Sequence, residues 1–259
     1  AIVSPAVPES EWWRVNRDGS QGVLQVAYDM KVPSVVQVSS VAVLGPTQPG
    51  EEADESRSVD PKSYFSLYQK TKRAADDIAL EFADQGLGIK IVYPGFGYGH
   101  VTVTGYPTFS DQTLLRAAAG KSVSILGSGK NQLSLTYYND IVEGILLAHE
   151  HGQQGEGYIL GGETVTLPEV WKVIAGSLDR DPPRRRTPVW LARMKTNLAS
   201  WTTGRATYTP DFLDMIGRDW NFSSEKAKRE LGWQPHSFQE GIAQTWESYQ
   251  AMGWGGDRA

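Results

Sequence analysis

The first hundred residues alternate between helix-like and strand-like spacing of apolar positions. Residues 12–31 carry apolar side chains at intervals of three and four, which predicts an amphipathic helix, and residues 63–85 predict a second one. The compact, valine-rich run 34–39 and the run 88–92 are typical of short buried strands. Helix, strand, helix and strand joined by short links indicate parallel βαβ units. We therefore expect an α/β fold with a doubly wound parallel sheet.

Beyond Gly99 the pattern is less regular. Helices are predicted at residues 113–119, 140–149 and 166–178, and strands at residues 123–126 and 157–160. The composition changes near Asp179, where prolines and three arginines precede a tryptophan-rich remainder with helical patterns. We place a parallel-sheet domain in residues 1–163 and a small, mainly helical C-terminal lobe in residues 164–259.

Composition and charge exclude several classes of function. Apolar residues make up 40% of the chain and the net charge is −5, which argues against nucleic-acid binding because that needs basic surfaces. The absence of cysteine excludes disulfides, thiolate metal sites and a cysteine nucleophile, and the scattered histidines predict no metal site. No apolar run approaches the length of a membrane-spanning helix, about 20 residues. The N-terminus also lacks signal-peptide features, so we expect no membrane partner and a cytoplasmic location.

Tyr68 and Lys72 form the strongest local chemical feature. They lie four residues apart on the predicted helix 63–85 and so share one face. A phenol ordinarily titrates near a pH of about 10, and a neighbouring ammonium lowers its pKa. Such a tyrosine can exchange a proton with a substrate alcohol or carbonyl. The spacing alone favours a solvated helix face, so the surrounding residues decide between the two interpretations.

The residues that follow the two predicted strands favour the chemical interpretation. Ser39 and Ser40 close the run 34–39, and the loop Tyr93-Pro94-Gly95-Phe96 follows the run 88–92. Because ligands bind at the carboxyl ends of the strands in a doubly wound sheet, we expect both segments at one ligand-binding edge. A serine at that edge can donate a hydrogen bond to a reacting oxygen.

Several motifs in this order resemble one enzyme family. V-S-S-V-A-V-L-G (38–45), Y-Q-K-T-K (68–72), Y-P-G-F-G-Y-G (93–99) and K-A-K-R-E-L-G-W-Q-P (226–235) look like the extended short-chain dehydrogenase/reductase superfamily, also called the NAD-dependent epimerase/dehydratase family. The resemblance implies a Rossmann-like sheet in residues 1–163, NAD or NADP as cofactor, and a small-molecule substrate bound by residues 164–259. It also implies a possible homodimer formed through two long helices.

The resemblance carries roles onto individual positions. It implies that Tyr68 is the acid–base residue, that Lys72 lowers its pKa and holds the nicotinamide ribose, and that Ser40 polarises the substrate oxygen. Ser39 would lie beside the nicotinamide, and Asn16 would place the cofactor or order the catalytic helix. Backbone groups of three further residues would line the nicotinamide pocket: Pro94, Gly95 and Phe96.

The glycine-rich dinucleotide fingerprint of the family is not found. Gly95-Phe96-Gly97-Tyr98-Gly99 does not replace it, because no helix is predicted directly after it to receive a pyrophosphate. The resemblance suggests that Ala1 is the last alanine of a strand that ends in H-L-A-A in relatives, so we expect an N-terminally truncated chain with the first strands missing. Residues 1–259 alone are then expected to bind nicotinamide cofactor poorly and to be inactive as a fragment, which a calorimetric titration tests.

Two positions bear on the substrate. Sugar dehydratases of the family carry an acidic residue directly after the catalytic serine or threonine, whereas Val41 follows Ser40 here. Nucleotide-sugar epimerases carry an arginine seven residues before the position of Asp140, where this chain has Leu133. The motif S-S-V-A-V-L-G together with Y-I-L-G-G-E (158–163) resembles dihydroflavonol-reductase-like or hopanoid-associated epimerase-like members, and the leading prediction is a ketoreductase or alcohol dehydrogenase. A sugar or nucleotide-sugar epimerase and a non-catalytic family member remain as alternatives.

The tryptophans of the C-terminal lobe leave one further alternative open. They would either line an apolar substrate pocket or pack in the core of the lobe. The residues are Trp190, Trp201, Trp220, Trp233, Trp246 and Trp254.

Overall fold

Contacts divide the protein into two compact units, each built from three separated stretches of chain. The computed structural model describes residues 1–3, 7–100, 109–120, 124–203 and 210–253. The first unit combines Ala1–Gly95, Ile141–Gly161 and Phe222–Gln234, and the second combines Phe96–Asp140, Gly162–Asn221 and Pro235–Ala259. Tertiary contacts thus join segments that are distant in sequence, and the domain boundary expected after residue 163 stays a prediction.

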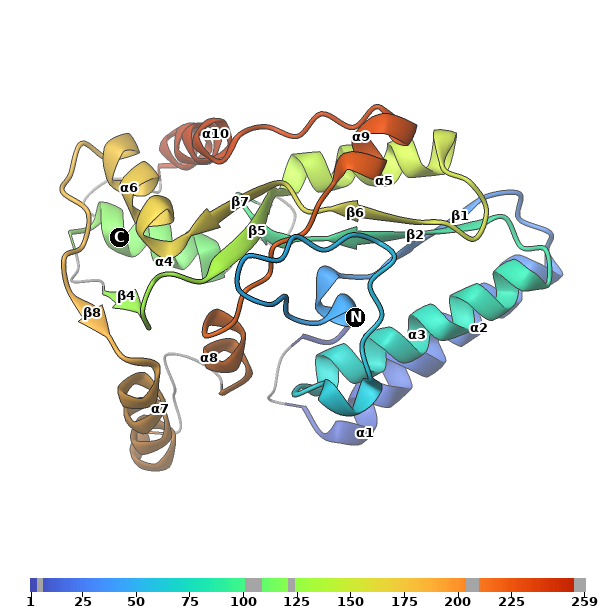
Figure 1. The fold of residues 1–259 in the computed structure, drawn as a ribbon, viewed down its shortest axis with the longest axis horizontal. Helices are drawn as coiled ribbons and strands as arrows, with labels where there is room; N and C mark the ends of the chain where they lie inside the picture. The colour runs from blue at the N-terminus through green and yellow to red at the C-terminus, as the bar shows by residue number, and fades with distance from the viewer. Residues whose placement is uncertain (4–6, 101–108, 121–123, 204–209, 254–259) are drawn as a thin grey trace. The chain divides into compact units, whose positions relative to one another are not determined.

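A parallel three-stranded sheet forms the centre of the first unit (Figure 1). Its order is β1 (Val35–Val38), β2 (Ile89–Pro94) and β6 (Gly157–Leu160). Val38 pairs with Val92, and Pro94 pairs with Leu160. The expected parallel sheet is therefore present, and β2 runs two residues further than the sequence predicted.

Helices cover both faces of this sheet, as a doubly wound fold requires (Figure 1). Helices α2 (Gly19–Asp29) and α3 (Leu67–Asp84) pack on one face, while α9 (Glu225–Leu231) and the part of α5 (Tyr138–His151) that begins at Ile141 pack on the other. Alternate residues of β2 serve the two faces, since Ile89 and Ile91 contact the α2 and α3 cluster and Val92 contacts the α5 and α9 cluster.

The segment before α2 is helical but irregular. The short helix α1 (Glu9–Trp12) continues through a π-helical stretch, η1 (Trp13–Asp18), into α2. The sequence predicted one helix over residues 12–31, and the structure shows that it contains this wider turn. Single π-helical turns are rare and often mark functional positions. Asn16 lies within this one and is buried.

The second unit contains two small sheets and several helices. Its three-stranded sheet has the order β3 (Phe96–Tyr98), β5 (Gln132–Tyr137) and β7 (Glu163–Thr166), with β5 parallel to β3 and antiparallel to β7. A smaller sheet pairs β4 (Ile125–Leu126) with β8 (Arg186–Thr187). The helices of this unit are α4 (Phe109–Ala118), α6 (Leu167–Ser177), α7 (Val189–Thr203), α8 (Pro210–Ile216) and α10 (Phe238–Ala251).

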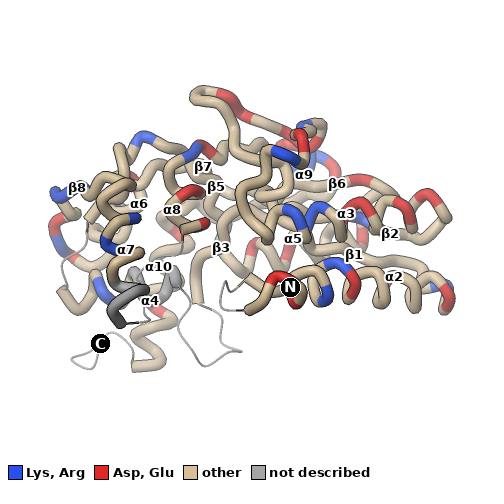
Figure 2. The backbone as a smooth tube through the Cα atoms, turned by 90° about the horizontal axis from the view of Figure 1, so that it is seen from below, with Lys and Arg blue, Asp and Glu red and all other residues tan. Residues whose placement is uncertain are grey.

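Charged residues of both signs lie on α3 and on α9 (Figure 2). On α3, Arg73 pairs with Asp77 at 2.7 Å, and on α9, Lys228 pairs with Glu225 at 2.9 Å. Opposite charges three or four residues apart stabilise an exposed helix by a few tenths of a kcal/mol.

Candidate active site

Helix α3 begins with a capping box that fixes where Tyr68 lies. The Ser66 hydroxyl accepts from the backbone N–H of Gln69 at 3.2 Å, and the Gln69 side chain accepts from the backbone N–H of Ser66 at 3.3 Å. Tyr68 therefore stands in the first turn of the helix, and Lys72 stands one turn further on the same face. The helix begins four residues later than the sequence predicted.

The segment after β1 folds into a short 3₁₀ turn headed by Ser40. This turn, η2 (Val41–Leu44), is capped by the Ser40 hydroxyl, which accepts from the backbone N–H of Ala42 at 3.2 Å. It ends at Gly45, whose φ of 73° is a left-handed conformation that glycine adopts without strain.

Two buried side chains hold the Ser40 turn against α3. The Gln69 side-chain amide donates to the carbonyl oxygen of Ala42 at 3.0 Å. The Tyr64 hydroxyl donates to the carbonyl oxygen of Val43 at 2.6 Å. Since Gln69 also takes part in the capping box, one side chain fixes both the start of α3 and the turn that carries Ser40.

The side chains of Ser40 and Tyr68 lie next to each other where the Ser40 turn packs against α3. Burial raises the pKa of the Tyr68 phenol, and a hydrogen bond with the Ser40 side chain opposes that rise. The structure therefore brings together the two hydroxyl groups that the sequence analysis assigned to the reacting oxygen.

Lys72 is buried behind them, with 6% of its surface exposed. Its ammonium donates to the carbonyl oxygen of Val38, the last residue of β1, at 2.5 Å. Burial lowers the pKa of Lys72, and the charge of Asp76 opposes that effect. Lys72 is not among the groups that shift the pKa of Tyr68 in this structure, so its expected effect on the phenol stays a prediction.

Asp76 is a buried acid that the sequence analysis missed. Its carboxylate is only 1% exposed and accepts from the Ser39 hydroxyl at 2.5 Å, while Oδ1 has no hydrogen-bond partner among the described residues. Burial raises its pKa to about 6, although Ser39 and Lys72 act in the opposite direction. The available signal was its position four residues after Lys72, on the helix face that carries Tyr68.

Asn16 contacts the helix that carries Tyr68. Its side-chain amide donates to the Thr71 hydroxyl and to the carbonyl oxygen of Ile2, both at 3.1 Å, and its oxygen accepts from the backbone N–H of Ile2 at 2.5 Å. Thr71 lies between Tyr68 and Lys72 in sequence. Of the two roles expected for Asn16, these contacts support the ordering of the catalytic helix.

The loop after β2 lies at the same edge of the sheet as Ser39. The backbone N–H of Ser39 donates to the carbonyl oxygen of Val92 at 2.8 Å, and that of Gly95 donates to Leu160 at 2.9 Å. Pro94 and Gly95 therefore stand at the carboxyl end of β2, next to the carboxyl end of β1. Phe96, the third residue expected in the nicotinamide pocket, begins β3 of the second unit, where its ring meets the edge of Trp220 at 5.5 Å.

This edge of the sheet fits the nicotinamide half of a dinucleotide. Tyr68 and Lys72 supply hydroxyl and ammonium donors that can hold ribose oxygens, and the loop at Pro94 and Gly95 offers backbone groups beside them. Strand ends of a parallel sheet are where such ligands bind. Among the described residues, no group of three or more histidine or acidic side chains is arranged to hold a metal ion. None of the helices in the described ranges is long and apolar enough to cross a membrane.

Comparisons with known proteins show the family to which the chain belongs. The family model described as "NAD dependent epimerase/dehydratase family" matches residues 6–161. A putative dihydroflavonol 4-reductase of Synechocystis is 27% identical over 93% of this chain and 71% of its own length. A 4-hydroxy-2-methyl-3-oxo-4-farnesyl-3,4-dihydroquinoline-1-oxide ketoreductase of Stigmatella aurantiaca is 28% identical over 90% of this chain and 70% of its own length.

Solved structures share the fold. The crystal structure of gox2253 superposes with a TM-score of 0.80 at 25% identity and covers 98% of this chain and 77% of its own. The dTDP-glucose 4,6-dehydratase DesIV of Streptomyces venezuelae, determined with NAD and TYD bound, has a TM-score of 0.72 at 25% identity, over 95% of this chain and 69% of its own.

Proposed function

Because the chain belongs to the NAD dependent epimerase/dehydratase family, we propose that it transfers hydride between a nicotinamide cofactor and a carbinol or carbonyl carbon, with Tyr68 moving the proton. The expected family, the enzyme class and NAD as cofactor are confirmed by the comparisons. The observation that carries the proposal is the junction of Ser40 and Tyr68, with Lys72 buried behind it, at the ligand-binding edge of the sheet. NADP as the cofactor and a cytoplasmic location stay predictions.

The hydroxyl groups of Tyr68 and Ser40 have different roles at the substrate oxygen. When bound, the cofactor supplies or accepts the hydride at its nicotinamide ring. In the direction of reduction, Tyr68 donates its proton to the oxygen of the carbonyl as that oxygen becomes negative. Ser40 donates a second hydrogen bond to the same oxygen and polarises it. In the direction of oxidation, Tyr68 takes the proton from the alcohol.

Burial of the phenol suits the acid role. The raised pKa keeps Tyr68 protonated at neutral pH, as a proton donor must be. Taking the proton from an alcohol requires the phenolate, which a nearby cation stabilises. Lys72 is the cation expected to do this, and the charge of Asp76 opposes the lowering of the Lys72 pKa by burial.

A reductase is favoured over a nucleotide-sugar epimerase. Leu133, which stands where such epimerases are expected to carry an arginine, is 4% exposed and lies among apolar side chains. Val41, directly after Ser40, is fully buried and supplies no acid for a dehydratase. The reductases among the relatives support the same choice.

The test measures turnover in protein expressed from the complete coding sequence. Reduction of a ketone should consume reduced nicotinamide, detected by its absorbance, whereas an epimerase would convert its substrate without net consumption. Tyr68→Phe should lower kcat by at least about a hundredfold because the proton donor is lost. Undiminished kcat in that variant would refute the proposed role, and conversion without net nicotinamide oxidation would establish the epimerase instead.

We also propose that the protein forms a homodimer through α2 and α3. Val23, Val26 and Met30 form a stripe on α2, with exposed fractions of 68%, 57% and 74%. Leu80 on the neighbouring helix α3 is also exposed. Apolar side chains three and four residues apart on one helix face are typical of a helix-packing surface. The chemistry of this stripe fits a second copy of the same two helices.

A further inference from the structure

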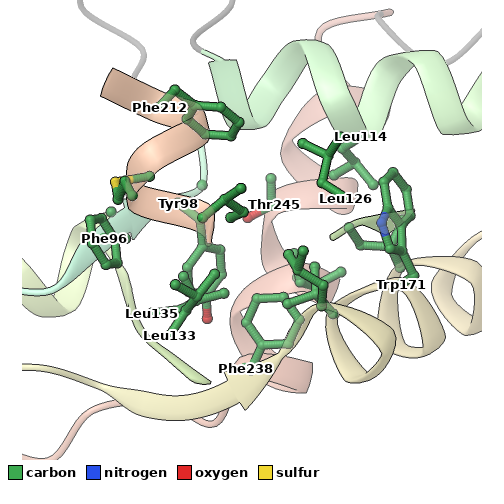
Figure 3. A pocket seen from close by; sticks show the side chains of 18 of the residues that line it. Phe96, Tyr98, Leu114, Leu126, Leu133, Leu135, Trp171, Phe212, Phe238 and Thr245 are labelled. Atoms are coloured by element: carbon green, nitrogen blue, oxygen red, sulfur yellow. The ribbon is translucent and has the colours of Figure 1, made fainter. Parts of the chain in front are cut away.

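A cavity of about 210 Å³ lies within the second unit and has almost entirely apolar walls (Figure 3). Aromatic and aliphatic side chains from β3, β5, α6 and α10 line it. Figure 3 shows Tyr98, Leu133, Leu135, Trp171 and Phe238 around the opening. None of the described residues that line the cavity carries a charge.

Two hydroxyl groups in these walls, those of Thr245 and Ser124, already have hydrogen-bond partners. The Thr245 hydroxyl donates to the carbonyl oxygen of Gly241 at 2.6 Å. The hydroxyl of Ser124 shares a hydrogen bond of 2.8 Å with that of Thr187. A polar ligand group placed in this cavity would lose its bonds to water and gain few in return, which costs several kcal/mol. A hydrocarbon group loses nothing and buries apolar surface.

Leu133 gives the strongest evidence that the cavity favours a hydrocarbon group over a charged one. It lies on the cavity wall in β5, where the resemblance to nucleotide-sugar epimerases leads us to expect an arginine. A diphosphate in this cavity would therefore meet leucine instead of a bidentate cation. Leu135, two residues along the strand, also lines the cavity.

Chain connectivity links the cavity to the proposed site. Phe96 to Gly99 line the cavity and follow Pro94 and Gly95 without a break. In the sequence, the cavity wall therefore begins at Phe96, the last residue of the segment expected beside the nicotinamide.

We propose that this cavity binds a neutral alicyclic hydrocarbon group of the substrate. The assignment of that group to the substrate rests on the proposed function, while the affinity of the cavity for it does not. The cavity exceeds the size of about 150 Å³ that accommodates benzene in an engineered protein, so it accepts roughly a pair of fused rings. Water leaves such walls readily, and the ligand gains dispersion contacts with the apolar side chains that line the cavity.

The test is a calorimetric titration of the full chain with 2-decalone, a neutral bicyclic ketone, and with UDP-glucose as the charged rival. The wild type should bind 2-decalone and show weaker or no binding of UDP-glucose. Leu133→Arg, which places a charge in the wall, and Leu133→Phe, which fills the space, should each weaken binding by at least about tenfold. Leu146→Arg is the matched control, because Leu146 lies on the exposed surface of α5 in the first unit.

The outcomes separate this inference from the proposed function. Tyr68→Phe should bind 2-decalone as the wild type does, since the phenol is not part of the cavity wall. No binding of 2-decalone by the wild type, tighter binding of UDP-glucose, or unchanged binding in a folded Leu133 variant would overturn the inference. Should Leu133→Arg fail to fold, Leu133→Phe and Ile216→Phe, which also narrows the cavity, give the answer. Turnover that survives Tyr68→Phe removes the proposed function and leaves the cavity result standing.

Discussion

The Ser39 hydroxyl donates a hydrogen bond of 2.5 Å to the buried carboxylate of Asp76, and so ties the end of β1 to the middle of α3. Lys72, one turn before Asp76, donates to the carbonyl oxygen of Val38, directly before Ser39. The end of β1 therefore receives two polar contacts from one face of α3, and that face also presents Tyr68. The orientation of the proposed acid relative to the sheet depends on these contacts.

Asp76→Asn should stabilise the fold at alkaline pH and change it little in acid. Burial raises the pKa of Asp76 from 3.8 to about 6, so the folded state holds its proton more tightly than the unfolded state. That contribution is present below a pH of about 4 and is lost as the pH rises through about 6. An asparagine keeps the acceptor for Ser39 without a charge, so the free energy of unfolding at pH 8 should rise by up to about 3 kcal/mol.

Urea unfolding at pH 4 and pH 8 checks this prediction. Asp77→Asn is the matched control, because Asp77 is an exposed neighbour whose ion pair with Arg73 contributes at most about 1 kcal/mol. If Asp76→Asn instead lost the same stability at pH 4 and at pH 8, the raised pKa of Asp76 would not control stability. The carboxylate would then be needed in its charged form.

Lys72→Met should raise the KM for nicotinamide cofactor by about tenfold or more and lower kcat. Methionine keeps much of the length of the side chain but has no ammonium to hold the ribose or to favour the phenolate of Tyr68. The pH at which oxidation of the alcohol reaches half its maximum rate should also move upward. Steady-state kinetics against pH measures both effects. Lys70→Met, on the exposed side of the same helix, is the control, and a KM equal to that of wild type would exclude the ribose contact.

Asn16→Ala should destabilise the fold by about 1 to 3 kcal/mol. Asn16 is 2% exposed, and its loss leaves Thr71 and the backbone of Ile2 without their shared partner. Denaturant unfolding gives the value, with Asn197→Ala on the exposed face of α7 as the control. A change within about 0.5 kcal/mol, the usual range for surface substitutions, would show that these hydrogen bonds contribute nothing net.

Val26→Glu should convert the proposed homodimer into a monomer. A carboxylate at the centre of the α2 stripe would be buried without a partner in the dimer. Sedimentation equilibrium measures the mass in solution. Val142→Glu makes the same change at an exposed position of α5 and should leave the mass unaltered. A wild-type protein that sediments as a monomer at high concentration would refute the dimer.

Local patterns predicted the first unit well. The valine-rich run at Val35 and the run at Ile89 are strands that neighbour each other in a sheet covered on both faces, so nearly every position favours apolar side chains. The site residues Ser40, Tyr68 and Lys72 were identified because ordered motifs surround them. Their roles stay predictions, although the structure places Ser40 against Tyr68.

The second unit shows where local patterns fail. Strand β5 was missed because Ser134 and Thr136 are polar yet fully buried, which interrupts the apolar run. In the first unit, Asp76 was missed for the same reason, since a carboxylate next to Asp77 in the sequence looks like part of a solvated helix face. In both places tertiary hydrogen bonds, which a sequence pattern does not contain, make burial of a polar group tolerable.

The tryptophans of the C-terminal lobe illustrate the same limit. Trp220 and Trp233 are buried as core residues, with Trp233 in the first unit, while Trp190 is 67% exposed. Trp201 and Trp254 lie outside the residues whose side chains the structure describes. The cavity is lined instead by Trp171, which the sequence analysis did not single out.

Asn16 serves two partners with one side chain, and this has a consequence for how motion spreads through the first unit. The backbone around Ile2 and the first turns of α3 share a single anchor in the π-helical turn. Loosening of either partner releases the amide and weakens its hold on the other. Hydrogen exchange at Ile2 and Thr71 should therefore rise together, as one cooperative opening that does not require the sheet to unfold.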